Sequence, residues 1–241
     1  MIRQPTTIAV PPRGMIADGA KLLTSAAEHP QTQTDQARCP IRPWQRTIKY
    51  TLDVFGSFLL LVLLSPLIVL AALSIKIHDG GPVIYRRRVV GLKGEFDAFK
   101  LRTMCVNADD VLQQTPHLRT EFEQNFKLKS DPRITLVGRI LRKFSIDELP
   151  QLFNVLKGQM SLVGPRMVNP AELEKFEGSR WIFAQMKPGM TGYWQVFGRH
   201  EVSYSKRVNM ETFYVENWSL LLDLKILLRT PFTVLRGTGA Y

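Results

Sequence analysis

Residues 54–75 read VFGSFLLLVLLSPLIVLAALSI, and no charged side chain interrupts this stretch. As a helix rising about 1.5 Å per residue it would be roughly 33 Å long, enough to cross a hydrocarbon layer of about 30 Å. A core helix of a soluble protein is seldom apolar over such a length, so the stretch predicts a membrane helix. The rest of the fold is expected to be arranged around this segment.

Two residues in the middle of the stretch, Ser65 and Pro66, predict a kinked helix. Proline lacks an amide donor and its ring collides with the carbonyl of Val62, which the Ser65 hydroxyl could then help to satisfy. Basic residues flank the stretch on both sides: Arg38, Arg42, Arg46 and Lys49 before it, and Lys76, Arg86, Arg87 and Arg88 after it. Because basic clusters favour the cytoplasmic side, we favour a re-entrant helix, broken at Ser65-Pro66, over a spanning one.

The charge of the whole chain points to a polyanionic partner. Its 241 residues carry 32 Lys and Arg against 21 Asp and Glu, a net charge of +11. Nucleic acid, anionic lipid and a phosphorylated substrate are all compatible with that excess. Two cysteines, Cys39 and Cys105, are too few for a disulfide framework or a zinc site, which favours a reduced, cytoplasm-facing protein.

The chain divides into three predicted parts. Residues 1–45 are rich in Pro, Thr, Gln and Ala and predict a disordered tail. Residues 46–78 hold the membrane helix, and residues 79–241 form a cytoplasmic catalytic domain. Within that domain the patterns predict short strands over 82–100, helices over 105–127, 134–142 and 147–157, and an amphipathic helix over 218–235.

The last of these helices has two interpretations. It could lie in the membrane interface with Trp218 at headgroup depth, or it could be a plain core helix. With the membrane segment present we favour the interface. The predicted fold class is therefore α+β and helix-rich, with a re-entrant N-terminal helix, a small β element, and interfacial amphipathic helices around a cytoplasmic catalytic site.

Basic residues after the membrane helix are candidates for binding phosphate. Arg86 to Arg88 are close to that helix and are expected to rest on anionic lipid. Lys100 and Arg102 lie further along, on one side of a predicted strand, which favours contact with a phosphorylated substrate.

The acidic pair Asp147-Glu148 is the strongest candidate for chemistry. If Asp147 starts the helix that contains Pro150, then the helix N-terminus and Arg142 are expected to keep its carboxylate ionised. An ionised, positioned carboxylate near a guanidinium could attack a phosphorus atom, and Glu148 could act as a base or hold a divalent metal. On spacing alone, an ordinary helix cap beside a surface acid is the more common interpretation.

Two glycine-rich turns add weaker candidates. Gly164-Pro165-Arg166 presents an arginine, and the segment from Lys187 to Arg199 combines glycines, aromatic rings, Gln195 and Arg199. Arginine with aromatic rings suits a nucleotide, whose phosphate and base they can contact, so Gln195 and Arg199 are predicted to bind one.

Taken together, these motifs resemble the monotopic phosphoglycosyl transferases, a family of bacterial sugar transferases, in the galactosyl type that starts exopolysaccharide synthesis. The resemblance runs from about Lys49 to Tyr241. Its carriers are Ser65-Pro66, FKLRTM (99–104), DPRIT (131–135), DELPQ (147–151), NVLKG (154–158), MSLVGPR (160–166) and PGMTGYWQ (188–195).

The resemblance implies a role for each matching residue. Asp147 would attack the β-phosphorus of a UDP-sugar, expel UMP and carry a phosphosugar that undecaprenyl phosphate then takes up. Glu148 would activate the acceptor and, with Asp147, hold Mg2+. The residues matching phosphate contacts are Lys100, Arg102, Arg142 and Arg166, and Ser65-Pro66 matches the break of the re-entrant helix.

The implied sugar is galactose, with glucose as the alternative. The implied partners are a UDP-hexose, undecaprenyl phosphate, membrane lipids and downstream glycosyltransferases, without nucleic acid. The implied location is the inner membrane, with the catalytic domain facing the cytoplasm. Two departures from the family pattern stand out: Leu101 replaces the usual Phe, and Met167 replaces the usual Pro after the turn arginine, which is expected to loosen the hold on Arg166.

Two rival functions remain at this point. A direct glycosyl transferase would release UDP, but the usual acidic metal motif of that class is not apparent in the sequence. A membrane-tethered adaptor that binds polyanions would explain the charge but would leave Asp147 and Glu148 without a task.

Overall fold

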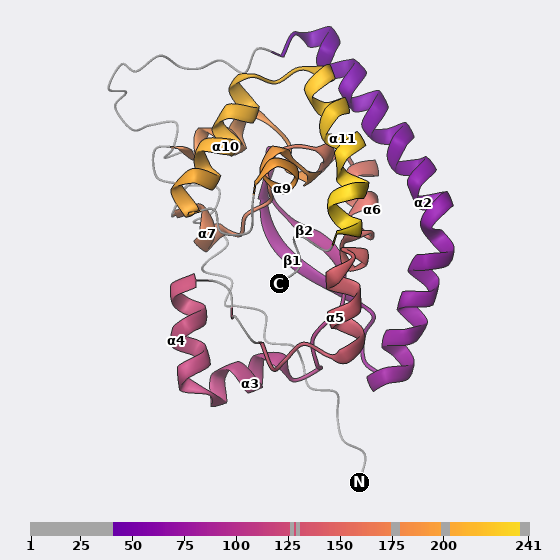
Figure 1. Ribbon diagram of the computed structural model, residues 1–241, viewed down its shortest axis with the longest axis vertical. Coiled ribbons are helices and arrows are strands. Elements are labelled where there is room, and N and C mark those ends of the chain that lie inside the picture. Colours follow the sequence, from indigo (N-terminus) through magenta and orange to yellow (C-terminus); the bar gives the residue numbers. More distant parts are fainter. Residues whose placement is uncertain (1–40, 126–127, 129–130, 175–178, 199–202, 237–241) are drawn as a thin grey trace.

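The computed structural model describes residues 41–125, 128, 131–174, 179–198 and 203–236 (Figure 1). Residues 1–40, which make up nearly all of the predicted disordered tail, lie outside the described residues. The helices are α2 Pro43–Asp79, α3 Ala108–Gln114, α4 Pro116–Asn125, α5 Leu136–Lys143, α6 Gln151–Leu156, α7 Pro170–Glu174, α8 Trp181–Gln185, α9 Tyr193–Phe197, α10 Tyr204–Glu216 and α11 Leu220–Leu235. The strands are β1 Ile84–Gly91, β2 Gly94–Leu101, β3 Ser161–Val163 and β4 Gly189–Thr191, and η2 Ile146–Glu148 is one turn of 3-10 helix.

The predicted apolar helix is α2, which begins at Pro43 rather than at residue 46. By length and composition it could cross a membrane: its most apolar window has a mean hydropathy of 2.8, and only 11% of that window is buried. Four residues on α2 are buried, Asp53, Ser57, Ala71 and Ile75, and their spacing places them toward the domain. Between residues 54 and 75 the rest of the helix surface is almost entirely apolar and largely open, as a lipid-facing helix requires.

The chain passes Ser65 and Pro66 without leaving the helix, so the structure has no break into two helices there. As predicted, the Ser65 hydroxyl donates to the carbonyl of Val62 at 2.8 Å, the acceptor that Pro66 leaves free. This bond lets α2 continue past the proline, and Figure 1 shows it as an arc along one side of the molecule. A re-entrant path through a membrane stays a prediction.

Two small sheets hold the domain together. β1 and β2 form the predicted antiparallel hairpin, in which Ile84 pairs with Leu101 and Gly91 with Gly94. β3 and β4 run parallel and pair Val163 with Thr191. Only glycine fits at position 189 of this second sheet, because a Cβ there would lie 2.1 Å from the backbone nitrogen of Gly164. The fold is thus helix-rich with small β elements, as predicted.

The main hydrophobic core lies between the hairpin and the C-terminal helices. It combines Val89 and Ala98 of the hairpin with Leu152 of α6, Phe183 of α8 and Tyr214 of α10. Gly56 brings α2 close to this core, since a Cβ there would meet Leu162 at 2.9 Å. The hairpin, the C-terminal helices and the apolar helix are therefore packed together.

The position of Trp218 corrects one prediction. Its side chain is 5% exposed, and its indole nitrogen donates to Asp223 Oδ2 at 3.2 Å, so it lies in the core and not at headgroup depth. An indole N–H that finds a buried carboxylate has no need of the water interface. The outer face of α11 is nevertheless apolar, with Leu221, Leu224, Leu228, Phe232 and Leu235 all more than half exposed.

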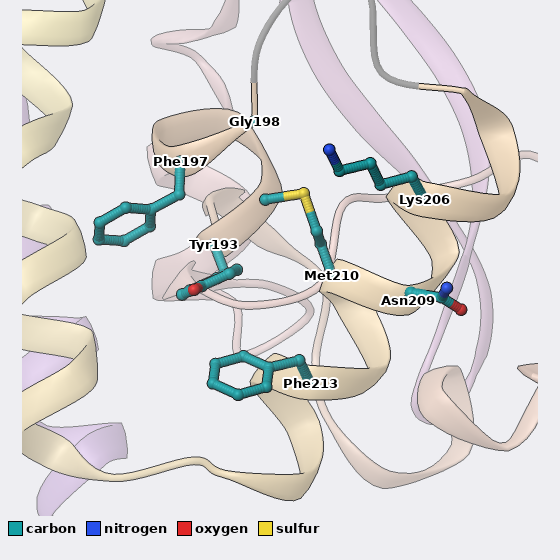
Figure 2. A pocket seen from close by; sticks show the side chains of 7 residues that line it. All are labelled: Tyr193, Phe197, Gly198, Lys206, Asn209, Met210 and Phe213. Atoms are coloured by element: carbon teal, nitrogen blue, oxygen red, sulfur yellow. The ribbon is translucent and has the colours of Figure 1, made fainter.

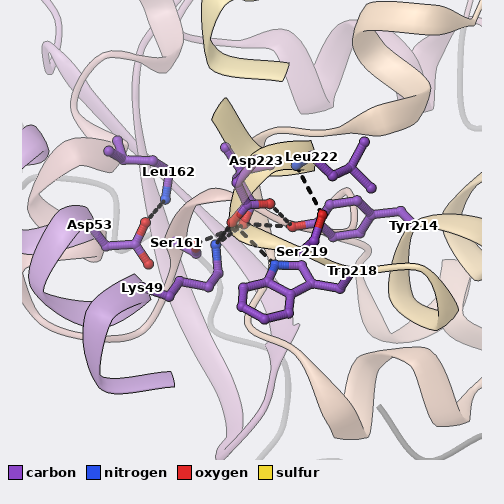
Figure 3. A network of polar contacts seen from close by, with 10 residues as sticks. Lys49, Asp53, Ser161, Leu162, Tyr214, Trp218, Ser219, Leu222 and Asp223 are labelled. Carbon is purple, nitrogen blue, oxygen red and sulfur yellow. Dashed lines mark hydrogen bonds and ion pairs between the residues drawn. The ribbon is translucent and has the colours of Figure 1, made fainter. Parts of the chain in front are cut away.

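A buried polar network joins the start of α2 to α11 (Figure 3). Lys49 Nζ lies 2.6 Å from Asp223 Oδ2 and also donates to the carbonyl of Val163 at 2.9 Å. The Tyr214 hydroxyl donates to the same carboxylate at 2.7 Å. Asp53 accepts the backbone N–H of Leu162 at 3.0 Å. These contacts fix the apolar helix against β3 and the last helix.

Candidate active site

Asp147 lies in η2, between α5 and α6, and not at the start of an α-helix as predicted. The amides of Leu149 and Leu152 each donate to a carbonyl three residues earlier, which gives 3-10 geometry, and α6 begins only at Gln151. Ser145, with φ of 53°, turns the chain out of α5 into η2 and is the one non-glycine residue with a positive φ in the described ranges. Such strained turns often hold functional side chains in place.

Lys100 of β2 brings the two carboxylates together. Its Nζ is 2.5 Å from Glu148 Oε1 and 3.9 Å from Asp147 Oδ2. The strand is fastened to α6 by Asn154, whose Oδ1 accepts from the Phe99 amide and whose Nδ2 donates to the Asp97 carbonyl. The hairpin therefore places Lys100, predicted to bind the substrate phosphate, against η2, where it forms one cluster with the predicted catalytic pair Asp147 and Glu148.

The pKa values of the two acids move in opposite directions. Burial raises the pKa of Asp147 to about 6, while Lys100 and then Arg142 oppose the shift. Burial acts in the same direction on Glu148, but Lys100, together with Arg166 and Arg87, leaves the pKa of that carboxyl below its ordinary value. Arg142 favours the ionised form of Asp147 as predicted, but Asp147 lies in η2 rather than at the start of an α-helix, and burial has the larger effect on its pKa.

Arg142 belongs to this cluster as predicted. Its Nε donates to the Thr103 hydroxyl at 2.8 Å, which orients the guanidinium from α5. Burial lowers the pKa of Arg142, and the nearby negative charge of Asp147 counteracts that effect. A partly buried guanidinium close to a carboxylate suits an anionic substrate.

Arg102 is placed elsewhere. The strand ends at Leu101, and the Arg102 guanidinium is paired with Asp79 at the end of α2. It is 9% exposed and thus joins the hairpin to the apolar helix. Its role in binding phosphate stays a prediction without support from this geometry.

Arg166 is held on both sides of its turn. Its backbone N–H donates to Glu211 Oε1 at 3.1 Å, and it forms a bridge with Gly189. Met167, the departure from the family pattern, is 5% exposed and packs in the core. Burial raises the pKa of Glu148, and the charge of Arg166 opposes that effect after the larger influence of Lys100.

Gln195 lies apart, on α9, and Arg199 lies outside the described residues. A pocket of about 440 Å³ lies between α9 and α10, lined by Tyr193, Phe197, Gly198, Lys206, Asn209, Met210 and Phe213 (Figure 2). Its rings are packed together, with centroids of Tyr193 and Phe197 4.7 Å apart. The predicted nucleotide-binding segment therefore borders an aromatic pocket, while a role for Gln195 itself stays a prediction.

Sequence reasoning missed a charged group next to the cluster. Arg87, expected to face lipid, is turned inward and lies 3.6 Å from the buried Glu172 of α7. The same glutamate is 3.3 Å from Arg207 of α10. No motif links residues so far apart, and only the alternation of β1, which separates Arg87 from its neighbours Arg86 and Arg88, could have suggested it.

The donor set at the cluster fits the predicted Mg2+. Asp147 and Glu148 are adjacent carboxylates, and Mg2+ is commonly held by one or two carboxylates together with substrate phosphates. Within the described ranges no group of three or more His, Cys, Asp or Glu side chains could form a metal site by itself. A substrate diphosphate would have to supply the remaining oxygens.

Known proteins resemble this chain over most of its length. A family model described as "Bacterial sugar transferase" matches residues 44–237. The chain is 48% identical to "Undecaprenyl-phosphate galactose phosphotransferase" of Salmonella typhimurium, over 81% of this chain and 42% of that protein. It is 44% identical to "Exopolysaccharide production protein ExoY" of Sinorhizobium fredii, over 83% of this chain and 91% of that protein.

A third relative carries a different sugar in its name. "UDP-glucose:undecaprenyl-phosphate glucose-1-phosphate transferase" of Caulobacter vibrioides is 41% identical, over 80% of this chain and 72% of that protein. The matched region thus spans less than half of the Salmonella relative but nearly all of the Sinorhizobium one.

Proposed function

The chain belongs to the bacterial sugar transferase family, and from this premise we propose that it transfers a hexose 1-phosphate from a UDP-sugar to undecaprenyl phosphate and releases UMP. The observation that carries the proposal is the buried Asp147, next to Glu148 and Lys100, in a domain packed on an apolar helix. A water-soluble anionic donor and a lipid acceptor can meet only at such a boundary.

In the first step the Asp147 carboxylate attacks the β-phosphorus of the donor. The bond from that phosphorus to the bridging oxygen breaks, and UMP leaves with the oxygen. The hexose phosphate is then held on Asp147 as an acyl phosphate. Burial keeps the pKa of Asp147 high for a carboxyl, which makes its ionised form a stronger nucleophile, while Lys100 keeps that form populated near neutral pH.

In the second step a phosphate oxygen of undecaprenyl phosphate attacks the same phosphorus and frees the Asp147 carboxylate. Glu148, 35% exposed and bonded to Lys100, is the group that can take a proton from the incoming phosphate. Its exposed side chain leaves room for a second substrate to approach.

The two carboxylates also suit Mg2+, which when bound would neutralise part of the diphosphate charge. Asp147 and Glu148 would hold the ion together with donor oxygens. Lys100 and Arg142 keep their own contacts to Glu148 and Thr103 and remain available to the phosphates.

We propose galactose as the sugar, because the relative with 48% identity bears galactose in its name. Glucose is the alternative, supported by the relative from Caulobacter vibrioides. The product would begin exopolysaccharide synthesis, consistent with the name of the Sinorhizobium relative. Downstream glycosyltransferases would then extend the lipid-linked sugar.

We further propose that the protein resides in the inner membrane with its site facing the cytoplasm. The apolar arc of α2 would enter and leave on the cytoplasmic face, and the exposed leucines of α11 would lie in the interface. This arrangement would bring the headgroup of the acceptor to the level of η2.

The decisive experiment is a nucleotide-release assay on the full chain in detergent or nanodiscs with a panel of UDP-sugars. Each donor is tested with and without undecaprenyl phosphate and Mg2+. We expect UMP to be released with UDP-galactose. Without acceptor, mass spectrometry should find one hexose phosphate on the peptide containing Asp147, and the adduct should disappear when acceptor is added.

Release of UDP, together with an unmodified Asp147 peptide, would instead indicate direct glycosyl transfer. Binding of polyanions without release of any nucleotide, and unaffected by Asp147→Ala, would indicate a membrane-tethered adaptor.

A further inference from the structure

Two arginines from separate parts of the chain face one buried carboxylate, and a third acts electrostatically on one of them. Glu172 of α7 is 7% exposed, and its two oxygens face Arg87 of β1 at 3.6 Å and Arg207 of α10 at 3.3 Å. Arg166 lies beside Arg207, whose pKa it helps to lower after the larger effect of burial. The group therefore contains more guanidinium groups than Glu172 alone can neutralise.

The register of the hairpin places this group next to the active site. Arg87 pairs with Ala98, and Lys100 is two residues further along the same strand, so Arg87 and Lys100 share a face of the hairpin as diagonal neighbours. Arg86 lies on the opposite face, where its guanidinium stands 6.0 Å from the ring centroid of Phe99.

Arg207 has donors to spare. Its side chain lies between the rings of Trp194 and Tyr204, with centroids 5.6 and 5.9 Å from the guanidinium carbon. One terminal nitrogen faces Glu172, but Nε and Nη2 are buried without a partner among the described residues. Buried N–H groups of this kind are normally satisfied, so two orphaned donors on one guanidinium indicate a site for an acceptor.

Glu211, one turn after Arg207, does not cancel this charge. Its carboxylate accepts the Arg166 amide through Oε1, and it is 1% exposed. Burial raises the pKa of Glu211 to about 7, so near neutral pH it carries only part of a negative charge. The three arginines thus keep an excess of positive charge in a protected place.

We propose that Arg87, Arg166 and Arg207 form the subsite for the phosphate of the leaving nucleotide, and that Glu172 positions two of them. The inference rests on the proposed function, in which UMP leaves as Asp147 attacks. Guanidinium groups bind phosphate oxygens with paired, charge-assisted hydrogen bonds and stabilise the charge that develops on the leaving group. Lys100 and Arg142 would serve the transferred phosphate, and the arginine group would serve the departing one.

The test is equilibrium binding of UMP to the full chain in nanodiscs by calorimetry, without turnover. Arg207→Gln and Arg87→Gln should each weaken UMP binding tenfold or more, while Arg86→Gln, the neighbour on the opposite face, should leave it unchanged. Uridine, which lacks the phosphate, should bind equally to all of these proteins. Arg207→Lys keeps the charge and should recover part of the UMP affinity. Such a recovery would show that the glutamine variant loses affinity through its missing charge and not through misfolding.

Unchanged UMP affinity in Arg87→Gln and in Arg207→Gln would overturn the proposal. The proposal would also be overturned if these variants had a higher KM for undecaprenyl phosphate and an unchanged affinity for UMP, because the arginines would then bind the phosphate of the acceptor. Failure of the proposed function looks different: the wild type would bind UMP through these arginines and yet release none from any UDP-sugar.

Discussion

At Asp147 burial and ionisation oppose each other. Because its pKa is raised from 3.8 to about 6, the folded protein holds a proton that the unfolded chain loses as the pH rises from 4 to 6. The contribution of Asp147 to the free energy of unfolding is complete below about pH 4, and it is lost as the pH rises through about 6. Asp147→Asn should therefore stabilise the protein by about 1–3 kcal/mol at pH 7.5, with no gain near pH 4.

The same substitution removes the proposed nucleophilic oxygen, so the rate of UMP release should fall about a thousandfold or more. Thermal unfolding at both pH values and the nucleotide assay check the two effects on one preparation. Asp110→Asn, an exposed acid of α3, is the control and should change neither. A lower stability of Asp147→Asn than of the wild type at pH 7.5 would show that burial does not raise the pKa of Asp147.

Lys100 should control the acid limb of the pH–rate profile. With Asp147 titrating at about pH 6, UMP release should decline below that value, because the protonated carboxyl is not nucleophilic. Lys100→Met removes the cation that opposes protonation and should move the limb to higher pH, while Lys100→Arg should restore it. The measurement is the initial rate of UMP release between pH 5 and 9, and a limb that stays in place in Lys100→Met would contradict this role.

Residue types were easier to predict than their partners. Asp147 and Glu148 are adjacent in the sequence, and Lys100 was identified separately as a candidate for binding phosphate. The partners of Arg102 and Arg87 were not, because Asp79 and Glu172 reach them only through where a strand ends and which face a side chain occupies. Burial of Asp147 was likewise invisible, since it depends on packing across η2, α5 and β2.

Among the elements, α2 makes the sharpest prediction. If its path is re-entrant, tags at the N-terminus and after Lys76 should both be accessible from the cytoplasm. Pro66→Leu restores the missing amide, should straighten the arc, and should move the N-terminal tag toward the periplasm. Val69→Leu in the same helix is the control. A periplasmic N-terminal tag in the wild type would establish a simple span.

Most elements could be predicted because their patterns are local. The apolar run, the hairpin around Gly91 and Gly94, and helices near 134–142 and 218–235 all appear in the structure. The start of α6 was wrong because the 3-10 turn around Asp147 depends on contacts with Lys100 from another element. The prediction for Trp218 was wrong because its hydrogen bond to Asp223 depends on how α10 and α11 pack together, which the sequence pattern does not show.

On the scale of the whole molecule, the Lys49–Asp223 pair decides whether helix and domain stay together. Asp223→Ala would leave the Lys49 ammonium, 12% exposed, with only a carbonyl as partner, and would also free Tyr214 and Trp218. Breaking a buried pair by removing one partner costs about 3–5 kcal/mol, and we expect a loss of that order in denaturant unfolding in detergent. Asp223→Asn should cost less, and Lys225→Ala, on the exposed side of α11, should cost nothing measurable.

That network also sets an order of events during synthesis. Lys49 and Asp53 leave the ribosome with the apolar helix, while their partners follow only 174 and 109 positions later. Until then Lys49 and Asp53, one helical turn apart, can interact only with each other, beside a segment that is already in lipid. A nascent chain stopped after Arg166 would contain Asp147, Glu148 and Lys100 and still lack the helix that closes the structure. Folding to a protease-resistant state should therefore depend on α11, and a pulse-chase experiment should show protease resistance appearing only after α11 has emerged.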